Sequence, residues 1–257
     1  MKASQASTDS IEALQHTEGS DPEELQRDEL HFRVPPHGID GNLHYHNISI
    51  QKLLSSQLRS PLAEGMYPIH ERYEFRQELR TGDELRITTT YEIRDDRLLV
   101  DQQIEKDAIP CVYASHLLAK PGPDHTDYGS YYIDDVLLSA DNQRFVFLTK
   151  LGTSDIGLRD NHNLGFVVRS LDYTHGLEMD KDKERTVLGS KTRRSLKHGL
   201  NRPIIYLDHH ITVDPTGKGS LVKGSYCFMD LENRCCAEVP DDIYQRMKAL
   251  SITRSFR

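Results

Sequence analysis

The residues with the clearest potential for chemistry are an acid, an amide and an imidazole that alternate on one short segment: Asp40, Asn42 and His44. Asn47 follows shortly after, and a second acid, Glu78, stands in the segment FRQELRTGDELRI. An imidazole can accept a proton near neutral pH, a carboxylate can orient it or attack a carbonyl, and an amide can donate a hydrogen bond. This combination of residue types is typical of a hydrolytic site.

The elements around this segment suggest how it is positioned. Residues 30–34 alternate in polarity as a strand does, and Pro35-Pro36 ends that strand. Between Ile48 and about Leu62 the apolar residues recur at helical spacing. The backbone N–H groups where this helix begins, near Asn47 and Ile48, could polarise a bound carbonyl.

Four short runs after the helix are rich in β-branched or aromatic residues and predict an antiparallel meander, with strands at 73–79, 85–93, 97–105 and 111–118. Glu78 lies in the first of these runs, which could fold back beside the Asp40–His44 segment. Residues 240–251 predict a terminal helix, because acids stand at its start and basic residues near its end.

The sequence predicts the same supersecondary unit twice. Residues 147–163 align with residues 32–47, and the pairs Leu79/Leu196, Gly82/Gly199 and Ile87/Ile204 share one offset. We therefore expect a loosely ordered tail at 1–28, a first unit at 29–118, a linker at 119–143, a second unit at 144–239 and a C-terminal helix and tail at 240–257. The second copy carries Asp155, Arg159 and His162, with Ser195 opposite Glu78, so its site looks degraded.

One strand, a central helix and a wrapped antiparallel sheet resemble the hotdog fold. The acyl-carrier-protein thioesterases and the 4-hydroxybenzoyl-CoA thioesterase group carry a D-x-N-x-H-x-x-N type motif before the hotdog helix. That motif stands here as Asp40, Asn42, His44 and Asn47. The acyl-carrier-protein thioesterases also use a Glu in a segment resembling YRREC, and FRQEL places Glu78 at the corresponding spacing. The resemblance covers residues 30–118 well and 144–238 loosely.

The resemblance implies an α+β fold with a tandem double hotdog and an acyl thioesterase that needs no cofactor. Its substrate would be a thioester of an acyl carrier protein or of coenzyme A, in fatty-acid or polyketide-type biosynthesis. Asp40, Asn42, His44 and Glu78 would be catalytic, with attack either by water or by a carboxylate. One departure is that the acyl-carrier-protein thioesterases carry the motif in their C-terminal hotdog, whereas it lies here in the N-terminal one.

A basic window interrupts an otherwise acidic chain. Residues 187–207 contain no acid and five positive charges, among them Arg193, Arg194 and Lys197. Such a strip is either a solvated strand face or a docking site for an anionic group, such as coenzyme A phosphates or an acidic carrier protein. On the second interpretation we place Arg193, Arg194 and Lys197 with Asn47 and Ile48 among the substrate-binding residues.

Composition narrows the class of protein. With 257 residues and a net charge of −8, the chain is unsuited to nucleic acid as its main partner. No apolar run approaches the ~20 residues that cross a bilayer, and the N-terminal residues lack an apolar signal region, so we expect a cytoplasmic protein without membrane contact. The four cysteines form no CxxC pair, and His44-x-His46 has no evident third ligand, so we expect no metal.

Two other functions share the same sequence features. Hotdog hydratases and dehydratases also use an Asp/His pair, and a lyase or cyclase acting on a carrier-bound chain is the main alternative. Asp40 and His44 are one residue closer together than in the usual hydratase motif, which counts against that alternative. The second alternative is an acyl-binding double hotdog without activity. Two hotdogs in one chain can form a monomeric pseudo-dimer, and a homo-oligomer is also compatible with the sequence.

Overall fold

The computed structural model describes residues 26–37, 47–58, 61–120, 141–142, 144–178, 193–195, 204–212 and 218–252. The first half contains β1 (Gln26–Arg33), α1 (Asn47–Ser56), the 3₁₀ turn η1 (Pro61–Ala63), β2 (Tyr67–Phe75), β3 (Glu84–Arg94), β4 (Arg97–Lys106) and β5 (Ile109–Ala119). The second half contains a helical segment at 144–150, then α3 (Asp155–His162), β6 (Leu164–Glu178), β7 (Arg193–Ser195), β8 (Ile204–Thr212), β9 (Lys218–Asp230), β10 (Cys235–Cys236) and α4 (Asp241–Ile252).

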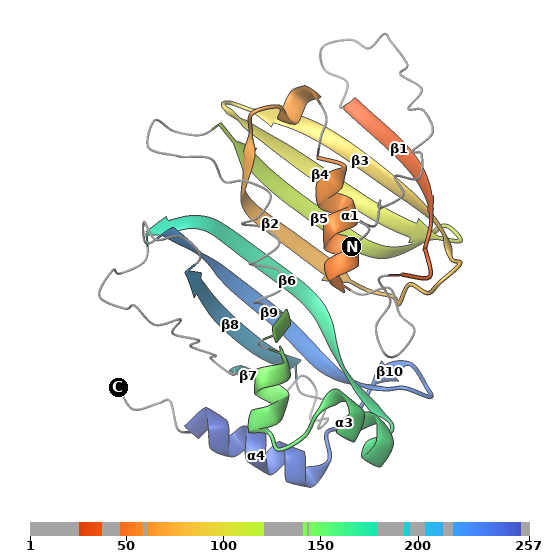
Figure 1. Cartoon of the computed structure of the whole chain (residues 1–257), viewed down its shortest axis with the longest axis vertical. Coiled ribbons are helices and arrows are strands. Elements are labelled where there is room, and N and C mark those ends of the chain that lie inside the picture. The colour runs from red at the N-terminus through yellow and green to blue at the C-terminus, as the bar shows by residue number, and fades with distance from the viewer. Residues whose placement is uncertain are drawn as a thin grey trace, which may run out of the picture.

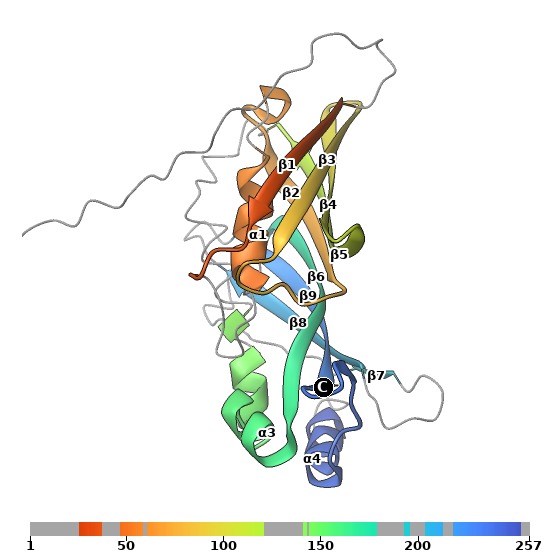
Figure 2. The ribbon, with the colours of Figure 1, turned by 90° about the vertical axis from the view of Figure 1, so that its right-hand side faces the viewer.

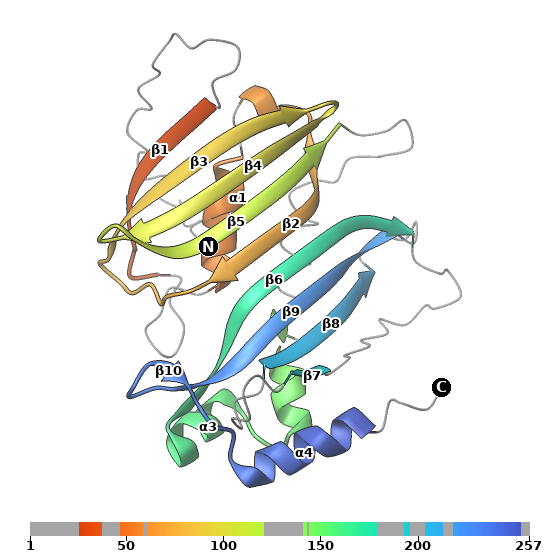
Figure 3. The ribbon, with the colours of Figure 1, turned by 180° about the vertical axis from the view of Figure 1, so that it is seen from behind.

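All the strands belong to one antiparallel sheet with the order β1-β3-β4-β5-β2-β6-β9-β8-β7, and β10 pairs with β9 beside this path. The two halves meet where β2 pairs with β6, with Glu71 opposite Tyr173. Figure 1 shows α1 lying across the sheet of the first half, and Figure 2 shows both layers from the side. Figure 3 shows the uncovered face, on which the strands of both halves run side by side.

Helix α1 forms because its apolar residues repeat on one face. Ile50 and Leu54 are 3% and 0% exposed and pack against the sheet. The sequence predicted a helix up to about Leu62, whereas α1 ends at Ser56. The N–H groups of Gln57 and Leu58 bond to the carbonyls of residues three positions earlier, which tightens and ends the helix.

The meander and the terminal helix agree with the sequence prediction within a few residues, but β2 does not. This strand ends at Phe75, so Glu78 lies in the connection to β3 and not in a strand. Residues 76 and 77 turn away because their N–H groups bond to the carbonyl of Cys111. At the N-terminus β1 begins at Gln26, so residues 26–28 are strand and not part of the expected tail.

Two copies of one unit are present, but the residue alignment between them was wrong. In sheet order β6, β7, β8 and β9 correspond to β2, β3, β4 and β5. Phe32 lies in β1, whereas Phe147 lies in a helical segment, and Ile87 lies in β3 while Ile204 begins β8. The alignment failed because apolar residues recur in both helices and strands, so short letter matches do not fix their register.

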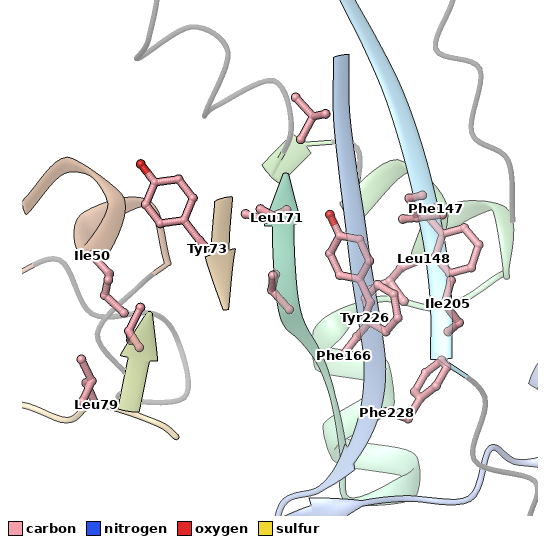
Figure 4. Close-up of a cluster of buried hydrophobic side chains, with 14 of the residues drawn as sticks. Ile50, Tyr73, Leu79, Phe147, Leu148, Phe166, Leu171, Ile205, Tyr226 and Phe228 are labelled. Atoms are coloured by element: carbon pink, nitrogen blue, oxygen red, sulfur yellow. The ribbon is translucent and has the colours of Figure 1, made fainter. Parts of the chain in front are cut away.

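One hydrophobic core runs through both halves (Figure 4). In the second half Phe166 stacks on Phe147 with ring centres 5.6 Å apart, and on Tyr226 at 5.2 Å. Ile243 and Met247 bring α4 into the same core. The second half is therefore covered by several short helices, where the first half has α1. Among the described helices none is long and apolar enough to cross a membrane.

Replacing Leu54 by Ala should lower the free energy of unfolding by about 2–5 kcal/mol, because a fully buried leucine leaves a cavity between α1 and the sheet. Urea denaturation monitored by circular dichroism would measure this. Ile93→Ala is the control, since Ile93 is 68% exposed, and it should change stability by less than about 0.5 kcal/mol. Equal effects of the two substitutions would contradict the packing of α1.

Candidate active site

Three of the residues selected from the sequence lie outside the described part of the chain. Asp40, Asn42 and His44 fall in residues 38–46, and their arrangement stays a prediction. Lys197 is also outside it. Arg193 and Arg194 pair in β7 with Tyr206 and Ile205 of β8, and only their backbone is described.

A groove of about 990 Å³ opens where the two halves part. The β2–β6 pairing covers residues 70–74 and 170–174, and beyond these residues the two strands separate. The groove wall combines Asn47 from the start of α1, Glu78 from the connection after β2, and residues 166–170 of β6. Two residues that the sequence selected from distant segments therefore face one groove. Ile48 is not part of this wall and packs against the core.

The carboxylate of Glu78 links the two halves across the groove. Its Oε1 accepts a hydrogen bond from the Arg234 guanidinium at 3.0 Å, and its Oε2 lies 3.4 Å from the Arg80 guanidinium. The two guanidinium groups hold the Glu78 carboxylate in a defined position, from which it can orient another group.

Arg234 is held in place by the turn between β9 and β10, residues 231–234. Asp230 accepts the backbone N–H groups of Glu232 and Asn233 at 2.8 and 2.9 Å, and these bonds, first among them the one from Asn233, lower the pKa of its carboxyl. Arg234 itself has a left-handed backbone with φ of 53°. The turn thus projects its guanidinium toward the first half.

Cations outnumber anions on the groove wall. Six arginines and three acids line it: Arg72, Arg76, Arg144, Arg159, Arg169 and Arg234, with Glu74, Glu78 and Asp155. Asp155 and Arg159 belong to the second-half motif that the sequence identified as degraded, and they face the same groove. A cationic wall in a chain of net charge −8 favours an anionic ligand.

A second cluster of ionisable residues was missed by the sequence analysis. Glu71 of β2 is 1% exposed, and its carboxylate bonds to Nδ1 of His116 on β5 at 3.0 Å and to Nε2 of His175 on β6 at 2.9 Å. The hydroxyl of Tyr73 donates to the same carboxylate at 2.9 Å. Each of these residues stands at an inward-facing position of its strand, and a polar residue at such a position is the signal that could have revealed the cluster.

The cluster extends in both directions as a row across the sheet. His116 Nε2 lies 2.9 Å from Oε1 of Gln102, whose amide nitrogen lies 3.4 Å from the hydroxyl of Thr89. On the other side, Nδ1 of His175 lies 2.8 Å from the hydroxyl of Ser220. The row therefore crosses six neighbouring strands, β3, β4, β5, β2, β6 and β9. All six side chains are at most 8% exposed, so the row is closed to substrate.

Hydrogen bonds orient the side chains in this row and lower the pKa of Glu71. The amide nitrogen of Gln102 donates to the carbonyl of Leu54 at 3.2 Å, so Oε1 of Gln102 must accept from His116. The Glu71 carboxylate is the other hydrogen-bond partner of the His116 ring. Burial alone would raise the pKa of Glu71, but the hydrogen bonds and charges of His116 and His175 together hold it well below its ordinary value.

Replacing Glu71 by Gln should lower the free energy of unfolding by about 3–5 kcal/mol at pH 7, because the buried side chains of His116 and His175 lose the carboxylate to which both are bonded. Urea denaturation of both proteins measures the difference. Glu92→Gln is the control: Glu92 is an exposed carboxylate paired with Arg94, and its loss should leave the stability nearly unchanged.

The same pair of proteins should show a specific pH dependence. The pKa of Glu71 is lower in the folded protein than in the unfolded chain, so its contribution is fully present above the unfolded value of about 4.3. The contribution is lost as the pH falls below that value. The stability gap between wild type and Glu71→Gln should therefore shrink between about pH 5 and pH 3. A gap that stays constant over this interval would show that Glu71 is not ionised in the fold.

Comparisons with known proteins concern the fold. No family model and no curated protein matches this sequence. A solved structure from Lactobacillus plantarum, assigned as an oleoyl thioesterase, is 10% identical, covers 79% of this chain and 95% of its own, and has a TM-score of 0.50. The 12:0-ACP thioesterase from Umbellularia californica is 8% identical, with 78% and 93% covered and a TM-score of 0.49. The match to the Lactobacillus structure spans both halves, and the chain is therefore an α+β protein with a tandem double hotdog fold.

Proposed function

We propose that this chain hydrolyses acyl thioesters of coenzyme A or of an acyl carrier protein, in the groove between its two halves. The observation that carries the proposal is that Asn47 and Glu78, selected from separate sequence segments, line one groove. Covalent geometry keeps His44, three residues before Asn47, within about 11 Å of the start of α1. His44 of the motif is thus within reach of the end of α1 that lines the groove.

The chemistry would proceed at the N-terminus of α1. Water or the Asp40 carboxylate attacks the thioester carbonyl, and His44 accepts the proton that a water nucleophile loses. The backbone N–H groups at the start of α1 and the amide of Asn42 stabilise the developing oxyanion. The intermediate then expels the thiolate, which takes up a proton. When Asp40 is the nucleophile, this step leaves a mixed anhydride on Asp40, and water then hydrolyses the anhydride to release the acid. Glu78, held by Arg234, orients His44 or the water, and the products are a carboxylic acid and a free thiol.

The cationic groove wall supports the choice of substrate. Coenzyme A and the prosthetic group of a carrier protein both present phosphate close to the thioester arm, and guanidinium groups bind phosphate with charge-assisted hydrogen bonds. The Lactobacillus and Umbellularia structures named above are those of thioesterases. These names agree with the proposed reaction class.

Thiol release from a panel of acyl-CoA and acyl-carrier-protein thioesters tests the proposal. Asp40→Ala and His44→Ala should each lower kcat/KM by about 100-fold or more, because they remove an acid–base or nucleophilic group. Glu78→Ala should lower it less, since Glu78 acts through another residue. Glu64→Ala, at an exposed acid outside the groove wall, is the matched control and should keep full activity.

Melting temperatures of these variants must stay near the wild-type value for the loss to be catalytic. Unchanged thiol release in Asp40→Ala and His44→Ala would exclude the motif as the site. Conversion of the acyl group without thiol release would identify a lyase, and no conversion of any thioester would contradict an enzymatic role for the groove.

Carrier docking at the basic strip is a separate part of the proposal. The double substitution Arg193→Glu/Arg194→Glu should raise KM for carrier-bound substrates by about tenfold, because it places negative charge opposite an acidic partner. KM for simple acyl thioesters should stay within twofold, as a rough limit for a site outside the groove. Arg94→Glu/Arg97→Glu, at the β3–β4 turn, makes the same charge change elsewhere and is the control. Equal effects on both substrate classes would exclude docking at this strip.

A further inference from the structure

Three of the four cysteines gather at one end of the groove. Cys227 lies on β9, while Cys235 and Cys236 form β10, and all three line the groove wall. The sulfur atoms of Cys227 and Cys236 are 3.8 Å apart. The mechanism proposed above uses none of these thiols. Figure 1 shows β10 as a short strand beside β9 at this end of the sheet.

The backbone holds these two thiols close together. β10 pairs antiparallel with β9, with Cys236 opposite Met229 and Cys235 opposite Asp230. Directly beyond this pair, the N–H of Ala237 donates to the carbonyl of Phe228 at 2.9 Å. Cys236 is therefore carried by a two-strand ladder next to Cys227, and this ladder holds the two sulfur atoms 3.8 Å apart.

Cys235 is a poor partner for either neighbour. Successive side chains of a strand point to opposite faces, so Cys235 points away when Cys236 points toward Cys227. Adjacent residues have Cα atoms about 3.8 Å apart, closer than the roughly 4.4–6.8 Å that an unstrained disulfide requires. The geometry thus selects one pair out of the three cysteines.

We propose that Cys227 and Cys236 form a reversible disulfide when the protein meets a low-molecular-weight disulfide, and that this bond fixes the turn at residues 231–234 against β9. Cys236 is exposed and reacts first, forming a mixed disulfide and releasing one thiol. Cys227, which is 6% exposed, then attacks the Cys236 sulfur and releases the second thiol. Two protein thiols are oxidised, and one small disulfide is reduced to two thiols.

The two steps should differ in rate. Burial and the neighbouring Cys236 raise the pKa of the Cys227 thiol to about 12, so little of it is thiolate at neutral pH. The mixed disulfide on Cys236 should therefore accumulate before the ring closes. Ring closure should also accelerate as the pH rises from 7 to 9, because the thiolate fraction of Cys227 increases.

Oxidation of the folded full chain with glutathione disulfide, followed by trapping of free thiols and mass spectrometry, tests the proposal. Cys227 and Cys236 should both lose their free thiols, and dithiothreitol should restore them. Trypsin cleaves after Lys223, Arg234 and Arg246, so the bond would join peptide 224–234 to peptide 235–246. The same treatment in denaturant should give at least about tenfold less of this linked pair, because the ladder no longer holds the thiols together.

Single substitutions separate the roles of the three cysteines. Cys227→Ser should stop at a stable adduct of one glutathione on Cys236, and Cys236→Ser should give no linked pair. Cys235→Ser is the matched control and should behave as the wild type does. A bridge between Cys235 and Cys236, bonds between chains, or four free thiols after treatment would each overturn the proposal. None of these readouts depends on thioesterase activity, so they stand apart from the test of the proposed function.

Discussion

The buried carboxylate of Glu71 is the constraint on which the arrangement of the two halves depends. It is bonded to an imidazole from the first half, His116, and to one from the second half, His175. A buried charge without enough partners is unfavourable, and docking of the second half adds His175 to the two partners of Glu71 in the first half, His116 and Tyr73. The β2–β6 pairing adds backbone hydrogen bonds at the same place and aligns the two imidazoles with the carboxylate.

This junction also determines where a ligand can bind. The β2–β6 pairing is short, and the two strands separate beyond it. The groove that opens there takes one wall from each half and reaches the N-terminus of α1. The salt bridge between Glu78 and Arg234 spans the same opening. A groove of this kind is a property of the tandem arrangement, because neither half alone supplies both walls.

The junction has two distinct parts, the buried row of hydrogen-bonded side chains and the open groove. Under α1 the space is filled by hydrogen-bonded side chains such as Gln102 and His116, both of which are at most 2% exposed. Within the described residues that space is closed at the row, and the open space lies where the strands part. The groove wall mixes nine charged side chains with apolar ones such as Phe75, Phe145 and Phe166.

The sequence by itself determined the local elements and two residues of the groove. The helical spacing of Ile50 and Leu54 predicted α1, the β-branched runs predicted β3 to β5, and the family motif selected Asn47 and Glu78. These predictions were possible because periodicity and motif spacing are local properties of the chain. Tertiary structure alone decided the rest. Glu71 meets His116 and His175 across 45 and 104 residues of chain, and Glu78 meets Arg234 across 156. Strand pairing over such distances is set by packing of the whole sheet, so no local pattern contains it.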